Sequence, residues 1–173
     1  PVQRLTSKDH ATWLRRNIDS ERASISHPTD VEMPPESPET THYSVVDADG
    51  MAVSVTYTLE FGYGSGIVVP GAGFLLNNEM GDFNAGPGLT NASGLIGTTA
   101  NLARPQQRML SSMSPSIVAR DGKLVAVIGS PGGRTIINTT MQLILNVVEF
   151  GMSIPEAVAA PRIHHQWLPD RIR

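Results

Sequence analysis

Thr40 is the residue whose surroundings first suggest a nucleophile. It follows a proline-rich, acidic stretch and stands directly before an alternating, strand-like segment. A threonine hydroxyl is a weak nucleophile unless a base lies beside it. If the chain were cut before Thr40, the new α-amine, with a reference pKa of about 8, would lie within reach of Oγ and could act as that base. The simpler interpretation is that Thr40 and Thr41 only begin a strand.

A glycine-rich turn, Gly129-Ser-Pro-Gly-Gly133, lies between a predicted strand and the clearest predicted helix. Glycines there allow a sharp turn and leave backbone N–H groups at a helix N-terminus, where they could bind an anion or a developing oxyanion. The turn is not a P-loop, because Arg134 and Thr135 follow the glycine pair directly and the pattern GxxxxGK[ST] is absent. A tight structural turn is the alternative interpretation.

Three further polar groups could take part in chemistry. Residues 77–82 (NNEMGD) hold two amides and two carboxylates, which could bind an ammonium group or a metal, or could form an Asx-rich turn. Ser111 and Ser112 could hold a carboxylate or cap the backbone. His164 and His165 are adjacent in an extended segment, so they face opposite ways. We therefore reject a metal pair and expect one histidine in the core and one at the surface.

The bulk composition excludes several classes of protein. The chain has 173 residues, a net charge of −3 and no basic tract, which argues against nucleic acid as a partner. It has no cysteine, and therefore no disulfide, thiol nucleophile or thiolate metal site. No apolar run approaches the roughly 20 residues that span a bilayer. The lack of cysteine is compatible with an extracytoplasmic bacterial protein.

Local patterns predict the elements that must position these groups. We expect a helix over 7–18 with Ser7 as N-cap, and a linker over 20–39. Two hairpins are expected over 41–59 and 116–128, each turning at an Asp-Gly pair. A helix over about 136–148 ends before Gly151, and a second, with the Ser153–Glu156 capping box, runs through 157–160. Hairpins followed by helices predict an α+β fold with antiparallel sheets and helices outside.

Six motifs, taken together and in order, resemble those of one protein family. They are residues 40–47 (TTHYSVVD), 55–58 (VTYT), 75–80 (LLNNEM), 111–115 (SSMSP), 129–133 (GSPGG) and 160–169 (APRIHHQWLP). This set resembles the γ-glutamyltransferase family (γ-glutamyl transpeptidase or glutathione hydrolase). The resemblance is strong over residues 40–173, and residues 1–39 resemble the end of that family's large subunit.

The resemblance implies an N-terminal-nucleophile hydrolase with a four-layer αββα sandwich. Family members are made as a precursor that cleaves itself before a threonine, and here that bond would be Glu39–Thr40. Residues 1–39 would then end the large subunit, and residues 40–173 would be a C-terminally truncated small subunit. The remaining large-subunit portion would be the necessary partner, so we expect this stretch alone to have little or no activity.

The resemblance also implies a role for each matching residue. Thr40 would be the nucleophile, Thr58 would orient it, and the N–H groups of Gly132 and Gly133 would form the oxyanion hole. The other roles concern the amino-acid head of the substrate: Ser111 and Ser112 for its α-carboxylate, Glu79 and Asp82 for its α-ammonium, and Glu60 as a further contact. The substrate would be glutathione or a related γ-glutamyl amide, and the acceptor water or an amino acid. No metal or cofactor is implied.

Two positions depart from the family pattern and keep alternatives open. Glu60 stands where many members have asparagine, and Gly81 replaces a common acidic residue. A related acylase that cleaves glutaryl or β-lactam side-chain amides is therefore an alternative, as is an unprocessed, non-catalytic homologue. On the same resemblance, bacterial members being commonly exported, we expect a periplasmic or secreted protein.

Overall fold

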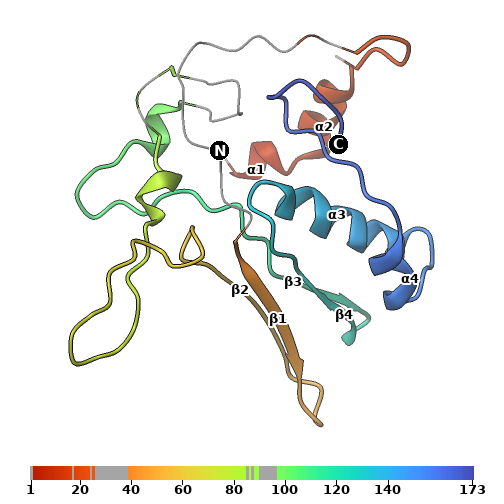
Figure 1. Ribbon diagram of the computed structural model, residues 1–173. Helices are drawn as coiled ribbons and strands as arrows, with labels where there is room; N and C mark the ends of the chain where they lie inside the picture. The colour runs from red at the N-terminus through yellow and green to blue at the C-terminus, as the bar shows by residue number, and fades with distance from the viewer. Residues whose placement is uncertain are drawn as a thin grey trace.

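The computed structural model describes residues 2–16, 18–23, 25, 39–84, 86, 88–89 and 97–173 (Figure 1). The predicted linker over 20–39 therefore lies mostly outside the described residues. The elements, in chain order, are α1 (Val2–Leu5), α2 (Lys8–Arg15), β1 (Thr41–Val46), β2 (Ala52–Tyr57), the 3-10 turns η1 (Glu79–Asp82) and η2 (Thr99–Asn101), β3 (Ser116–Arg120), β4 (Lys123–Ile128), α3 (Thr135–Val148) and α4 (Ile154–Ala159).

The first predicted hairpin is confirmed. Strands β1 and β2 pair antiparallel, with Thr41 opposite Tyr57 and Val46 opposite Ala52. Asp47 holds the connecting turn: its Oδ1 accepts the N–H groups of Asp49 at 3.0 Å and Met51 at 2.8 Å. Such an aspartate turn fixes the register, and the register decides which side chains of the two strands share a face.

The second hairpin is also confirmed, with β3 antiparallel to β4. Asp121 and Gly122 both have positive φ, 51° and 74°, as the two central residues of a tight hairpin turn require. The pairing shifts between Val118 and Ala119.

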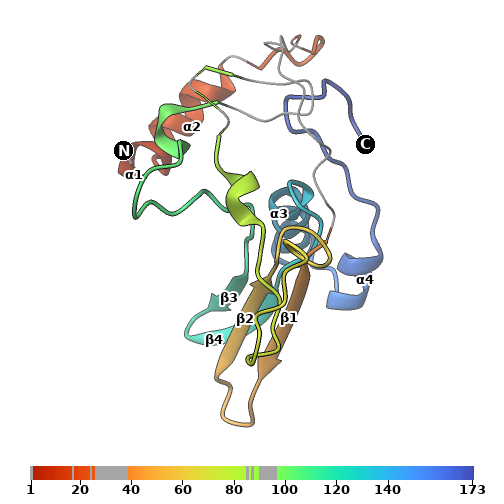
Figure 2. The ribbon, with the colours of Figure 1, turned by 60° about the vertical axis from the view of Figure 1, so that its left-hand side comes forward.

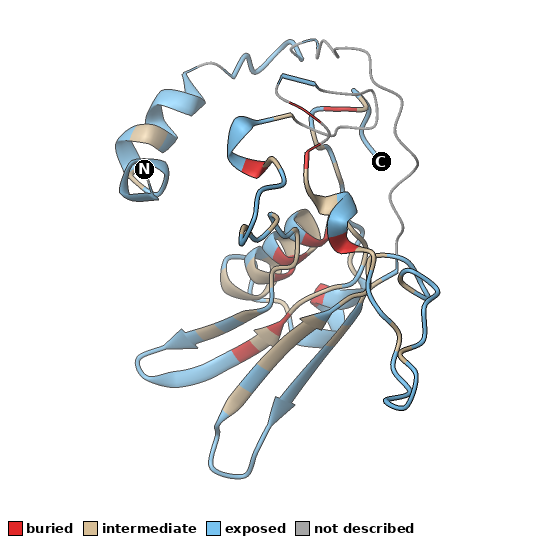
Figure 3. Ribbon diagram, turned by 90° about the vertical axis from the view of Figure 1, so that its left-hand side faces the viewer, coloured by how far each residue is buried: buried red, intermediate tan, exposed pale blue. Residues whose placement is uncertain are grey.

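The core lies where α3 and α4 cover β4 (Figures 1 and 3). Ala126 and Ile128, two residues apart on β4, pack with Leu143 of α3 and Ala157 of α4. Residues two apart on a strand point to the same face of the sheet. The apolar residues of α3 recur at the helical period, so they form one face of the helix, which packs on that side of β4. Glu156 closes the first turn of α4, since its Oε2 accepts from the backbone N–H of Ser153 at 2.8 Å, as the predicted capping box requires.

The N-terminal helix is shorter than predicted. Ser7 caps α2 as expected, accepting the N–H of His10 on Oγ at 3.1 Å. The helix ends at Arg15 rather than Ile18. None of its residues is buried, so no packing against the rest of the described chain supports a further turn.

Polar contacts join the two hairpins, which lie next to each other in both ribbon views (Figures 1 and 2). Ser44 Oγ on β1 donates to the carbonyl of Val127 at 3.4 Å, and Ser54 Oγ on β2 donates to that of Ile128 at 3.3 Å. The opposite face of β1–β2 is apolar and exposed, with Tyr43, Val45, Val53 and Tyr57 all open to solvent. The expected α+β character with antiparallel pairing is thus present. None of the helices in the described part of the chain is both long and apolar enough to span a membrane.

His42 ties β1 to the glycine-rich turn. Its Nδ1 lies 2.9 Å from Thr56 Oγ1 and its Nε2 lies 3.1 Å from Ser44 Oγ, so both ring nitrogens have partners. The ring covers Gly129 so closely that a Cβ there would overlap it. Burial lowers the pKa of His42, which favours the neutral ring in this position.

We therefore expect Gly129→Ala to destabilise the protein by about 1 to 3 kcal/mol, as overpacking does. Gly129 does not have the positive φ that would require glycine, so the cost comes from the clash alone. Gly62→Ala is the matched control, because a Cβ there meets only ordinary contacts at 3.6 Å. Unfolding by urea measures both variants. An unchanged midpoint for Gly129→Ala would show that the ring and the glycine are not packed this way.

Candidate active site

One cleft collects almost all of the residues that the sequence singled out. It is lined by Thr40, Thr58, Glu60, Glu79, Asp82, Ser111, Ser112, Met113 and Gly133. Of the nine predicted site residues only Gly132 is not part of the lining. The lining residues come from segments up to 93 positions apart in the chain, so the fold and not the local sequence brings them together.

The pairing of β1 with β2 explains why two threonines meet. Thr41 lies opposite Tyr57 at the end of the paired strands, and Thr40 and Thr58 are the next residues beyond this pair. Both hydroxyls donate to the carbonyl oxygen of Glu39, from Thr40 Oγ1 at 2.8 Å and from Thr58 Oγ1 at 3.0 Å. The backbone N–H of Glu60 in turn donates to Thr58 Oγ1 at 2.9 Å and fixes that hydroxyl. Two donors on one carbonyl oxygen polarise the carbonyl of the Glu39–Thr40 bond.

The glycine pair forms a turn whose carbonyls point into α3. The N–H groups of Thr135 and Ile136 donate to the carbonyls of Gly132 and Gly133, each at 3.1 Å. Both glycines have positive φ, 124° and 55°, and the value at Gly132 is open to glycine alone. Within the described part of the chain, neither glycine N–H donates to another backbone carbonyl. Two N–H groups at the N-terminus of a 14-residue helix can bind negative charge.

Three carboxylates, those of Glu60, Glu79 and Asp82, lie close together in the lining of the cleft. Glu79 is only 8% exposed, and its Oε1 has no hydrogen-bond partner among the described residues; the same holds for Glu60 Oε2. Burial, with the nearby charges of Asp82 and Glu60, raises the pKa of Glu79 to about 7. Burial likewise raises the pKa of Asp82, although a hydrogen bond from Glu79 and the charge of Arg134 oppose this. Such a cluster favours a cation that can donate several hydrogen bonds.

The neighbouring amides have a structural role. Asn77 Oδ1 accepts the N–H of Glu79 at 3.1 Å, and Asn78 Oδ1 accepts the N–H of Phe61 at 3.2 Å. Of the two interpretations of residues 77–82, the amides therefore follow the Asx turn, whereas the carboxylates face the cleft. No three or more His, Cys, Asp and Glu side chains within the described ranges are grouped so that they could hold a metal ion.

The serine pair also lines the cleft and belongs to the loop before β3. Ser111 Oγ accepts the N–H of Met113 at 3.1 Å, so its own hydroxyl proton can be donated elsewhere. Ser112 is half-buried and its carbonyl accepts from Ser114 Oγ at 3.3 Å. Hydroxyls placed this way can donate to a carboxylate.

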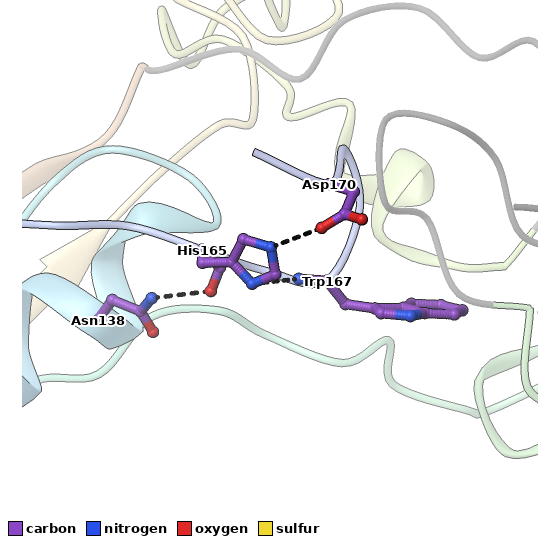
Figure 4. Close-up of polar contacts among 4 residues, drawn as sticks. All are labelled: Asn138, His165, Trp167 and Asp170. Carbon is purple, nitrogen blue, oxygen red and sulfur yellow. Dashed lines mark hydrogen bonds and ion pairs between the residues drawn. The ribbon is translucent and has the colours of Figure 1, made fainter. Parts of the chain in front are cut away.

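The two adjacent histidines diverge, but neither is a core residue, so that part of the prediction is wrong. His164 is half-buried between Asn138 Nδ2 at 3.1 Å and Gln166 Oε1 at 2.6 Å. Figure 4 shows that Asn138 and Asp170 approach His165 from opposite sides, with Asp170 Oδ1 3.2 Å from Nε2. The polar side chain of Asn138, on α3, explains the difference, because it offers His164 a hydrogen bond in place of an apolar environment.

Sequence reasoning missed three residues at or near the cleft. Met113 lines it, Arg134 lies close enough to lower the pKa of Asp82, and His42 packs under the glycine-rich turn. A basic residue directly after the glycine pair was a usable signal for Arg134. Nothing in the local sequence marks Met113 or His42, since both act through contacts with distant segments.

Known proteins resemble the chain over its whole length. The family model described as gamma-glutamyltranspeptidase matches residues 1–173. The chain is 51% identical over 176 residues to the glutathione hydrolase proenzyme of Escherichia coli (strain K12), covering 100% of the chain and 30% of that protein. The chain therefore belongs to the gamma-glutamyltranspeptidase family.

Solved structures of the family have the same fold. The gamma-glutamyltranspeptidase from Pseudomonas nitroreducens complexed with L-DON is 56% identical, with a TM-score of 0.69 over 75% of this chain and 67% of that one. A mutant of the Helicobacter pylori gamma-glutamyltranspeptidase is 56% identical, with a TM-score of 0.71 over 76% and 71%. The chain spans about 20% to 30% of the length of the curated relatives that it matches.

Proposed function

We propose that the full-length protein transfers or hydrolyses γ-glutamyl groups, with glutathione and related γ-glutamyl amides as donors. The observation that carries the proposal is the single cleft that holds a threonine at a polarised peptide bond, a glycine of an N–H-rich turn, a serine pair and three carboxylates. The curated relatives, which are named glutathione hydrolase proenzymes, support the same donor.

The proposed reaction begins with cleavage of Glu39–Thr40, which frees the Thr40 α-amine as general base. Thr40 Oγ1 then attacks the γ-carbonyl carbon of the donor and passes its proton to the Thr40 α-amine. The oxyanion accepts from the N–H groups of Gly132 and Gly133. Collapse expels the leaving amine, which takes the proton, and leaves a γ-glutamyl ester on Thr40. Water or an amino acid then attacks this ester and regenerates the hydroxyl.

The amino-acid head of the proposed donor matches two groups of side chains in the cleft, the serine pair and the three carboxylates. Ser111 and Ser112 would donate to its α-carboxylate, while Glu79, Asp82 and Glu60 would accept from its α-ammonium. Thr58 would hold the nucleophile, since it directly follows Tyr57, the residue that pairs with Thr41. The serine hydroxyls supply donors to a carboxylate that accepts, and the three carboxylates offer negative charge to a positively charged ammonium.

The proposal includes the larger assembly. We propose a four-layer αββα sandwich in which residues 1–39 end the large subunit and residues 40–173 belong to the small one. The exposed apolar face of β1–β2 supports a further layer, because a contiguous apolar face is normally covered. The rest of the precursor would supply that layer, and the periplasm or the exterior of the cell is the proposed location.

A comparison of two donors tests this function against the acylase alternative. We expect the processed full-length protein to prefer a γ-glutamyl anilide over the matching glutaryl anilide by about 100-fold in kcat/KM, because only the first presents an ammonium to the three carboxylates. Equal or better turnover of the glutaryl anilide would favour the acylase. Release of the anilide chromophore measures both.

Inhibition by L-glutamate should depend on pH. With its pKa raised to about 7, the Glu79 carboxyl is mostly neutral below that pH and attracts an ammonium less. The inhibition constant should therefore rise up to about tenfold from about pH 8 to about pH 6, and level off above pH 8. Glu79→Gln should flatten the profile. A constant that falls as the pH is lowered would contradict this assignment.

A further inference from the structure

Glu60 adopts an unusual backbone conformation at the rim of the cleft. Its φ of 73° is uncommon for a residue with a side chain. Two hydrogen bonds hold it there: its N–H donates to Thr58 Oγ1 at 2.9 Å, and its carboxylate accepts the backbone N–H of Gly81. This conformation turns the side chain of Glu60 toward η1, where Glu79 and Asp82 stand.

Gly81 provides the space that the Glu60 carboxylate occupies. A Cβ on Gly81 would overlap Oε1 of Glu60 and would lie 2.7 Å from its Cδ, closer than real contacts allow. Gly81 does not have a positive φ, so its backbone would accept any residue. Glycine at this position therefore leaves room for the Glu60 carboxylate, which would have to shift if a Cβ were present.

The carboxylates that meet here have unused acceptors. Glu79 is more than nine-tenths buried, yet its Oε1 has no hydrogen-bond partner among the residues that the structure describes, and neither has Oε2 of Glu60. Both residues line the cleft. Buried acceptors without a donor are costly, so the arrangement fits a ligand that brings several donors and a positive charge.

We propose that Glu60 and Gly81 form one specificity-determining pair, in which Gly81 leaves the space that lets the Glu60 carboxylate join Glu79 and Asp82 around the donor's ammonium group. This inference rests on the proposed function for the identity of the donor. It adds a dependence between two positions. The Glu60 carboxylate can help to bind the ammonium group only while the residue at position 81 has no side chain.

A double-mutant cycle on the processed full-length protein tests the pair. Gly81→Ala is expected to raise the KM for the γ-glutamyl anilide about tenfold and to leave kcat within about twofold. Glu60→Ala should cause a similar rise by removing the carboxylate. In the Glu60→Ala background, Gly81→Ala should add less than about twofold, because the clash no longer exists.

Two controls separate this role from a structural one. Gly62→Ala, two positions after Glu60 and with only ordinary contacts, should leave KM unchanged. Turnover of the glutaryl anilide should be insensitive to Gly81→Ala, since that donor has no ammonium. Glu60→Gln, which keeps the size of the side chain, should raise the γ-glutamyl KM even if Gly81→Ala fails to fold. Additive effects in the cycle, or equal losses with both anilides, would overturn the proposal.

Binding of L-glutamate, measured by calorimetry with the same variants, separates a failure of the proposed function from a failure of the proposed Glu60–Gly81 pair. If the wild-type protein turns over neither anilide but binds glutamate with the expected non-additive cycle, the proposed function fails and the pair stands. If glutamate binds equally well to wild type, Gly81→Ala and Glu60→Gln, or does not bind to any of them, the pair is refuted.

Discussion

Replacement of Thr40 by alanine is expected to leave the full-length precursor in one piece and to lower turnover of a γ-glutamyl anilide by at least about 10⁴-fold. The hydroxyl is the only group on this residue that can attack either the Glu39 carbonyl or a donor, and losing a nucleophile removes the covalent route altogether. Gel electrophoresis shows the cleavage, and release of the chromophore shows the turnover.

Thr41→Ala is the matched control for Thr40→Ala. Thr41 is the same residue type one position further on, and it is exposed in β1 rather than part of the cleft lining. This variant should be cleaved normally and keep turnover within a few-fold of the wild type. Thr40→Ser should also be cleaved, because it keeps a hydroxyl at the same place. A Thr40→Ala protein that still splits or still turns over donor would show that another residue is the nucleophile.

Gly132→Ala is expected to lower kcat by about 10² to 10³ with little change in KM, which is the loss typical of a damaged oxyanion hole. With φ of 124° the position excludes a side chain, and a Cβ there would lie 2.5 Å from Thr135 Oγ1. The peptide must therefore rotate, and the N–H groups of the turn move away from the cleft.

Gly122→Ala controls for the backbone strain itself. Gly122 also has a positive φ, 74°, but lies in the β3–β4 turn, where a Cβ would meet nothing. It should cost some stability and leave kcat unchanged. Steady-state kinetics on the cleaved fraction of each variant decides the matter. If Gly132→Ala raised KM and spared kcat, the turn would bind the donor in its ground state rather than stabilise the oxyanion.

Local signals were enough to predict the elements with strong local causes. Both Asp-Gly turns, the apolar period of α3 and the Ser153–Glu156 cap lie within short stretches of sequence. The end of α2 at Arg15 was not predictable in this way, because the pattern continues to Ile18 while packing that would hold the last turn is missing.

For the site itself, the sequence predicted the kinds of chemical group present but not how they are arranged. The sequence suggested hydroxyls, N–H groups and carboxylates, and only the family resemblance implied that Thr58 acts on Thr40. It did not indicate that His42 packs on Gly129, nor that the Glu60 carboxylate needs the space at Gly81. Such contacts join segments far apart in the chain, and no local propensity encodes them.

The Thr40 N-terminus is the most direct test of the central claim, that Thr40 becomes an N-terminal nucleophile. N-terminal sequencing of the purified full-length protein should show a second chain that begins Thr-Thr-His-Tyr, produced by cleavage of Glu39–Thr40 without added protease. A single uncut chain, or a second chain that begins at any other residue, would contradict the account.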